Sequence, residues 1–134
     1  MLRTSCCFGV DGVIIGKDRQ VGMTPTVIKL STGASEHIDV VQVSNVAQTI
    51  NELKKNGYWI VAADGSGDRL YDQIDYNGKM AIVVGSEGRG VSRLVLERSD
   101  FVARIPISGP VTSLNAAIAG AIFLCAAASF RNKK

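Results

Sequence analysis

The sequence is poor in the residues from which metal sites and disulfide frameworks are built. Of its 134 residues, one is a histidine (His37) and three are cysteines (Cys6, Cys7 and Cys125). No Cys-x-x-Cys pattern occurs, and the adjacent Cys6 and Cys7 cannot easily pair with each other. We therefore expect no metal site, and three free thiols in a reducing compartment, with Cys125 packed in an apolar helix.

Long hydrophobic runs and a secretory leader are also missing. The longest apolar stretch, Ala116–Ser129, is alanine-rich and too short to span a bilayer, which favours a buried helix. Arg3 and the short glycine-broken run after it do not make the apolar segment of a signal peptide. From these absences we expect a cytoplasmic protein without a membrane segment. No Ser-His-Asp or Cys-His arrangement suggests a nucleophilic hydrolase.

The composition is that of one folded domain. Hydrophobic residues make up 46% of the chain and charged residues 20%, which is typical of a globular protein rather than a disordered one. A chain of 134 residues can bury a sizeable core as a single domain. The net charge of +3 permits a nucleic-acid partner, but it suits a slightly basic cytosolic enzyme at least as well.

Apolar runs alternate with amphipathic stretches along the chain. We expect strands over Val10–Ile15, Val40–Val43, Tyr58–Ala63, Lys79–Val84 and Phe101–Ile105, the tail of a helix over Met1–Phe8, helices over Thr24–Gly33, Ser44–Asn56 and Val91–Arg98, and a final helix after Thr112 or Ser113. Strands that alternate with helices favour an α/β domain with a mainly parallel sheet flanked by helices. Trp59 lies in an expected central strand, so we predict that it belongs to the core. We also expect the strand over Val40–Val43 to be buried, and Val91, Leu94 and Val95 to face inward from their helix.

A glycine-rich loop, Gly85–Gly90, follows the strand that ends at Val84. It lacks the Gly-Lys-Ser/Thr of a Walker loop and the glycine order of a dinucleotide-binding loop, so a plain strand-to-helix turn explains it equally well. Glu87 within it is either solvated or held by a partner such as an arginine.

A second loop follows Pro106 and leads to Ser113, Leu114 and Asn115 at the expected start of the last helix. A serine cap followed by a core leucine accounts for the first two, whereas Asn115 is polar in an apolar run and needs a partner. The loop is rich in backbone donors that can hold a flat polar ligand. Two such strand ends form the crevice in which α/β proteins bind ligands.

Together these segments resemble the SpoU/TrmH branch of the SPOUT class of methyltransferases. Three motifs carry the resemblance, in the family's order, and span nearly the whole chain: Leu2–Ser5 with Phe8–Gly12, Val83–Gly90, and Ile105–Asn115. The middle of the chain, Thr24–Lys29 and Ser35–His37, is most similar to the 23S rRNA (guanosine-2′-O-)-methyltransferase subgroup.

The resemblance implies methyl transfer from S-adenosylmethionine to a ribose 2′-hydroxyl of RNA, with 23S rRNA as the expected substrate, by a homodimer that needs no metal. It implies a C-terminal trefoil knot into which the cofactor is bent. The matching motif positions that would bind the cofactor are Ala63, Gly65, Gly85, Ile105, Ile107 and Leu114. Arg3 would activate the hydroxyl, Glu87 would orient that arginine, and Ser113 and Asn115 would hold the reacting centre.

One feature departs from the family pattern. A strand and an Asn-x-Gly normally precede the first motif, but here Met1 stands at that place, so we expect residues 1–134 to be an N-terminally truncated catalytic domain without a separate RNA-binding domain. A lost strand would leave a groove in the sheet or an unpaired edge. The alternative is a catalytically inactive remnant that dimerises and binds cofactor or RNA. A nucleotide-binding Rossmann protein would need an early glycine loop, which is not in evidence.

Overall fold

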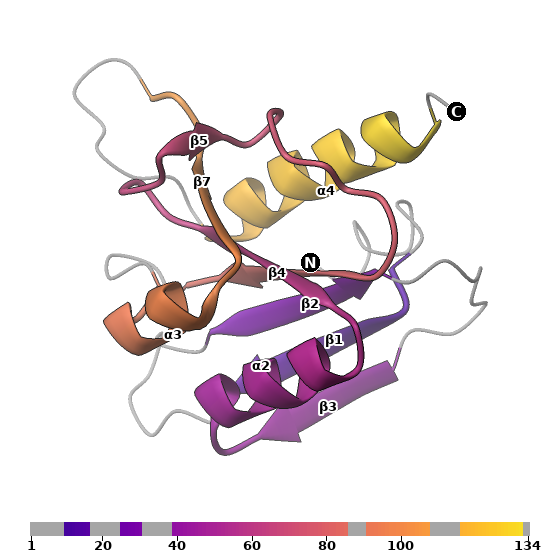
Figure 1. Ribbon diagram of the computed structural model, residues 1–134, viewed down its shortest axis with the longest axis vertical. Helices are drawn as coiled ribbons and strands as arrows, with labels where there is room; N and C mark the ends of the chain where they lie inside the picture. Colours follow the sequence, from indigo (N-terminus) through magenta and orange to yellow (C-terminus); the bar gives the residue numbers. More distant parts are fainter. Residues whose placement is uncertain (1–9, 17–24, 31–38, 86–90, 108–115, 133–134) are drawn as a thin grey trace.

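The computed structural model describes residues 10–16, 25–30, 39–85, 91–107 and 116–132 (Figure 1). Within these ranges the strands are β1 (Gly12–Gly16), β2 (Thr26–Leu30), β3 (Asp39–Val43), β4 (Trp59–Ala63), β5 (Arg69–Leu70), β6 (Met80–Val84) and β7 (Phe101–Arg104), and the helices are α2 (Val46–Lys55), α3 (Arg93–Arg98) and α4 (Ala116–Asn132). The strands form one sheet in the order β3-β1-β2-β6-β4-β7-β5.

The sheet is mainly parallel, as the sequence predicts. β6, β4, β7 and β5 are parallel neighbours, and β3 is parallel to β1. Only β2 runs against its neighbours β1 and β6 among the described strands. Helices α2 and α3 lie on one side of the sheet and α4 on the other (Figure 1). The α/β class is confirmed, whereas the knot stays a prediction because residues 86–90 and 108–115 lie outside the described part of the chain.

The predicted helix over Thr24–Gly33 is wrong, because Thr26–Leu30 forms strand β2. Pro25 stands just before the strand, a position that suits a strand as well as a helix, and its carbonyl accepts a hydrogen bond from the Gly16 N–H at 2.9 Å. The next three residues, Thr-Val-Ile, are β-branched and favour extended backbone. Pairing with β1 on one side and β6 on the other then buries Val27 and Ile28 on opposite faces.

Two apolar layers hold the fold together, one on each face of the sheet. Between the sheet and α4 lie the side chains of Ile28, Met80 and Ile82 from the strands and those of Phe123 and Leu124 from α4. Between the sheet and helices α2 and α3 lie those of Val27, Ile60 and Val83 from the strands, together with Ile50 from α2 and Val95 from α3. All five residues of β6 are buried, which is expected of a strand covered on both faces.

The ends of α2 follow the local signals in the sequence. Asn45 caps the helix by accepting a hydrogen bond from the Gln48 N–H at 3.1 Å. Asn56 is the C-cap of α2. Gly57 follows it with a φ of +88°, a backbone conformation that favours glycine.

Several predicted core residues are exposed instead. Trp59 is 53% exposed because it stands at the amino end of β4, whereas the next residue, Ile60, is fully buried. Leu94 is 48% exposed on the outer side of α3, although Val95 is buried as predicted. Cys125 is exposed on α4, between buried residues of the same helix. The predicted buried strand over Val40–Val43 is the exposed edge strand β3.

Within the described residues, no helix has the length and apolarity that crossing a membrane requires.

Candidate functional site

Three neighbouring parallel strands end together at one edge of the sheet, which we call the carboxyl edge. Ala63, the last residue of β4, is the register partner of Val84 in β6 and of Ala103 in β7. The residues that follow these strands, Gly85 and Ile105, therefore lie close to Ala63. The structure thus brings together three of the residues predicted to bind a ligand, at the place where α/β sheets hold their ligands.

The loop after β4 is organised by Asp64, which the sequence analysis did not single out. Its backbone N–H donates to the Ala103 carbonyl at 3.0 Å. Its carboxylate accepts from the Val91 N–H at 3.3 Å, and from the N–H and the hydroxyl of Ser66 at 3.1 and 2.6 Å. Asp64 therefore links the ends of β4 and β7 through its backbone, and its carboxylate reaches the residue that leads into α3. An aspartate two residues before a serine is a known turn signal, and it could have been read from the sequence.

The same loop rests directly on β7. A Cβ atom at Gly67 would lie 2.7 Å from the Val102 carbonyl oxygen and 2.7 Å from the Ala103 carbonyl carbon, so only glycine fits there. Arg104 donates from its guanidinium to the Gly67 carbonyl at 2.8 Å, and its own carbonyl accepts from the Tyr71 N–H at 2.9 Å. These contacts fix the path of residues 64–71 over the carboxyl edge.

Two predicted cofactor-binding residues present open surface at this edge. Nothing lies within 4 Å of the position that a Cβ atom would take at Gly65. Ile107 is 40% exposed, whereas Ile105 is half-buried against the core. The loop tip and the chain after β7 therefore offer backbone and apolar surface to a ligand, while the Asp64 contacts hold the base of the loop.

The other predicted site residues cannot be placed. Arg3, Glu87, Ser113, Leu114 and Asn115 fall in residues 1–9, 86–90 and 108–115, which lie outside the described part of the chain. Their roles remain predictions. In the ranges that are described, no group of three or more His, Cys, Asp or Glu side chains could hold a metal ion.

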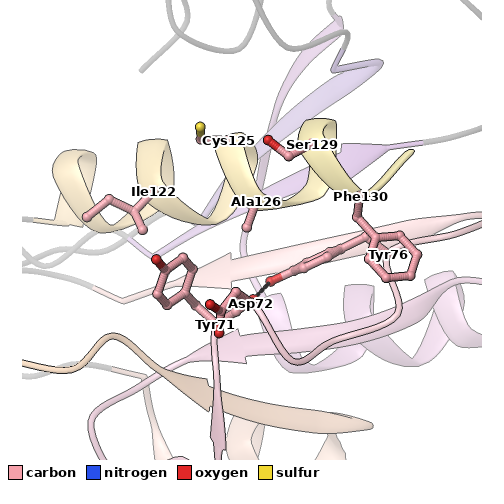
Figure 2. Close-up of a pocket in the computed structure, with 8 residues that line it drawn as sticks. All are labelled: Tyr71, Asp72, Tyr76, Ile122, Cys125, Ala126, Ser129 and Phe130. Carbon is pink, nitrogen blue, oxygen red and sulfur yellow. Dashed lines mark hydrogen bonds between the residues drawn. The ribbon is translucent and has the colours of Figure 1, made fainter. Parts of the chain in front are cut away.

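A groove of about 330 Å³ lies beside this edge, between the segment after β5 and helix α4 (Figure 2). It is lined by Tyr71, Asp72, Tyr76, Ile122, Cys125, Ala126, Ser129 and Phe130. The Tyr76 hydroxyl donates a hydrogen bond to the Tyr71 carbonyl. Burial, with Asp72 and Tyr71 nearby, raises the pKa of Tyr76, so the phenol stays protonated as a donor. None of the predicted site residues lines this groove.

The fold defines an α/β protein in which the loops of the carboxyl edge follow parallel strands. The chain belongs to the SpoU rRNA Methylase family, whose family model matches residues 1–125. The predicted resemblance is thereby confirmed.

Relatives and solved structures agree with this family. A protein of Staphylococcus saprophyticus, named as a TrmH family tRNA/rRNA methyltransferase, is 50% identical over 124 residues, which are 92% of this chain and 50% of the relative. A protein of the same name from Staphylococcus aureus (strain COL) is 48% identical over 124 residues, with the same shares of the two chains. The chain therefore spans about half the length of these relatives.

Among solved structures, the TrmH/SpoU tRNA modifying enzyme of A. aeolicus is 25% identical with a TM-score of 0.79, over 98% of this chain and 67% of that one. An RNA 2′-O ribose methyltransferase shares the fold with a TM-score of 0.77 at 21% identity, over 98% and 50% of the two chains. The SpoU methyltransferase AviRb from Streptomyces viridochromogenes, solved with AdoMet, shares it with a TM-score of 0.71 at 20% identity, over 99% and 55%.

Proposed function

We propose that this chain is the catalytic domain of an RNA methyltransferase that transfers a methyl group from S-adenosylmethionine to a ribose 2′-hydroxyl. The observation that carries the proposal is the meeting of Ala63, Gly85 and Ile105 at the ends of three adjacent parallel strands. Gly85 and Ile105 belong to motifs that resemble the SpoU/TrmH family, and Ala63 is the register partner of Val84 in one of them. Membership of the family supports methyl transfer as the reaction, and the carboxyl edge is where we propose that the cofactor binds.

The residues at the carboxyl edge suit S-adenosylmethionine. Gly65 is open, and Ile107, three residues beyond β7, offers exposed apolar surface. A backbone-rich, weakly charged edge of this kind can hold an adenosine moiety through main-chain groups. Ala63, Gly65, Gly85, Ile105, Ile107 and Leu114 would hold the cofactor, which supplies an activated methyl group when bound. The AdoMet in the AviRb structure supports S-adenosylmethionine as the cofactor, since that protein shares the fold.

The remaining machinery is proposed from the sequence. Arg3 would activate the ribose hydroxyl, which is a poor nucleophile without help, and Glu87 would orient Arg3. Ser113 and Asn115 would hold the reacting centre. We also propose the C-terminal knot and a homodimer, and 23S rRNA as the substrate, in a cytoplasmic protein that needs no metal. The names of the relatives, which mention tRNA and rRNA, support an RNA substrate.

Calorimetric titration of the 134-residue chain with S-adenosylmethionine tests the cofactor site, and one site per subunit is expected. Transfer of a radiolabelled methyl group to RNA then tests the activity. The 2′-O position is tested separately, because a 2′-O-methylated linkage resists alkaline hydrolysis and DNA of the same sequence offers no 2′-hydroxyl. Cofactor binding without transfer to any RNA would instead favour the inactive remnant.

A further inference from the structure

The edge of the sheet opposite the carboxyl edge, which we call the amino edge, carries an aromatic patch formed by the exposed Trp59 and the half-buried Phe101, and the Arg69 guanidinium reaches Phe101 from β5. Trp59 begins β4 and Phe101 begins β7, and their ring centroids lie 6.1 Å apart. The Arg69 guanidinium carbon lies 4.9 Å from the centroid of the Phe101 ring. More than half of Trp59 is exposed, although its neighbours in β4 are buried. A large aromatic surface left open beside a cation is typical of a binding surface rather than of a core.

A lysine pair lies next to this patch. The amino groups of Lys29 and Lys79 lie 5.8 Å and 5.6 Å from the centroid of the Tyr58 ring. The Lys79 carbonyl accepts the Trp59 backbone N–H at 3.0 Å, so the lysine pair and the aromatic patch adjoin at the start of β4, with Tyr58 on the side of the sheet that faces α2 and α3 and Phe101 on the side that faces α4. Helix α2 also ends nearby with the exposed Lys55 in its last turn, next to Lys54, which pairs with Asp100 at 3.6 Å. The amino edge therefore combines positive charge with an open ring.

This combination fits single-stranded RNA better than an acidic protein. Lysines next to one another neutralise phosphates, and their contribution depends on salt. An exposed tryptophan adds a face on which any nucleobase can stack, and arginine beside an aromatic ring strengthens such a platform. An acidic peptide would use the lysines but would leave the indole face unused. The observations therefore favour a ligand that has both phosphates and flat rings.

We propose that the amino edge binds a single-stranded segment of the RNA substrate, with one base stacked on Trp59 and neighbouring phosphates held by Lys29 and Lys79. The inference rests on the proposed function for the identity of the ligand. A five-residue strand such as β4 is about 17 Å long, so a few nucleotides of one RNA can pass from this edge to the carboxyl edge. The patch would then hold RNA that flanks the reacting nucleotide.

Trp59 is the single tryptophan of the chain, so its fluorescence reports on this surface alone. Titration with a short oligoadenylate RNA should quench that fluorescence. With end-labelled RNA and anisotropy as the readout, Trp59→Leu should weaken binding roughly 10-fold, because leucine offers no stacking face. Lys79→Gln should lower the slope of log K against log salt by about 0.7, the effect of one lost phosphate contact on a single strand.

Arg93→Gln is the matched control for charge. Arg93 lies on α3, it is exposed and it pairs only with Glu97 at 3.3 Å among the ion pairs of the described residues. It should leave both the affinity and the salt slope unchanged. Circular dichroism of each variant verifies that the fold is kept. Equal RNA affinity of folded Trp59→Leu and the parent chain would overturn the proposal, and so would equal quenching by an oligoglutamate peptide.

The proposed function fails in a different way. A chain that binds S-adenosylmethionine and methylates RNA equally well with and without Trp59 keeps the proposed function and contradicts the amino-edge site. A chain whose Trp59 is quenched by RNA but which binds no S-adenosylmethionine supports the amino-edge site and contradicts the proposed function.

Discussion

The Asp64 carboxylate accepts a hydrogen bond from the Val91 backbone N–H at 3.3 Å, across 27 positions of the sequence. Asp64 follows β4, and Val91 leads into α3, so the bond joins the loop at the carboxyl edge to the segment beyond the Gly85–Gly90 loop. The same carboxylate also holds Ser66. This side chain therefore couples two loops of the proposed cofactor site.

Replacement of Asp64 by alanine should loosen both loops. The Val91 and Ser66 N–H groups would lose their acceptor, and we expect the free energy of unfolding to fall by about 1–2 kcal/mol. Affinity for S-adenosylmethionine should fall as well, because the two loops of the proposed cofactor site are no longer held in place. Urea unfolding and calorimetry measure the two effects. Asp68→Ala, at an exposed position in the same loop, is the control and should change neither quantity.

Replacement by alanine should destabilise the fold at one glycine of this loop, Gly67, and not at the other, Gly65. At Gly67 the new methyl group would lie 2.7 Å from backbone atoms of Val102 and Ala103, so stability should fall by roughly 1–3 kcal/mol. At Gly65 nothing lies within 4 Å, so stability should change by less than about 0.5 kcal/mol. Gly65→Ala should nevertheless weaken S-adenosylmethionine binding. If it binds the cofactor as the parent chain does, Gly65 is not a cofactor contact.

Tyr76 should make the fold sensitive to alkaline pH. Burial is the main cause that raises the pKa of its phenol in the folded chain, whereas the unfolded chain has the ordinary value near 10. The folded state therefore keeps the proton to higher pH, and the stability that this contributes is fully present below about pH 10 and is lost as the pH rises through the folded pKa.

Tyr76→Phe should remove that part of the alkaline loss, at a cost of about 1 kcal/mol at neutral pH for the hydrogen bond to Tyr71. Urea midpoints of both chains on either side of pH 10 test this. The pKa of Tyr58 is also raised, first because of burial and then because of Asp11. The urea midpoints of Tyr58→Phe, measured at the same pH values, are therefore compared with those of Tyr76→Phe. An unaltered alkaline decline in Tyr76→Phe would contradict the assignment.

Asn115→Ala should abolish methyl transfer and leave the fold intact. The amide is the polar group in an apolar run at the third family motif, and we assign it to the reacting centre. Transfer of labelled methyl to RNA and circular dichroism measure the two properties. Asn51→Ala, at an exposed position of α2, is the control and should keep full activity. Activity in folded Asn115→Ala would remove this residue from the proposed site.

Local chemistry was enough to predict most of the elements and part of the site. Asn45 as a cap and Gly57 as a stop act within one helical turn, so their effect is readable from the sequence. Strands β4 and β6 are apolar throughout, as buried parallel strands are. The placing of Gly85 and Ile105 at one edge follows from the alternation of strands and helices, which makes neighbouring strands parallel.

The errors occur where the outcome depends on distant partners. A Thr-Pro pair before an apolar run can precede either a helix or a strand. Here Thr26–Leu30 forms strand β2 because it pairs with β1 on one side and β6 on the other. Trp59 and Cys125 have apolar neighbours in sequence, but only packing determines which side of β4 and of α4 is covered. The sequence also contained no sign that Asp64 would reach Val91.

The sequence by itself determined the α/β class, the order of most strands and helices, and the motifs that place the chain in the SpoU family. These depend on backbone propensity, capping and turn chemistry, which act over a few residues. Only the tertiary structure decided that Thr26–Leu30 is a strand, that Asp64 joins two loops, and that Trp59 lies open beside Lys79. Burial and long-range hydrogen bonds join residues that are far apart in the chain, so only the folded arrangement can assign them.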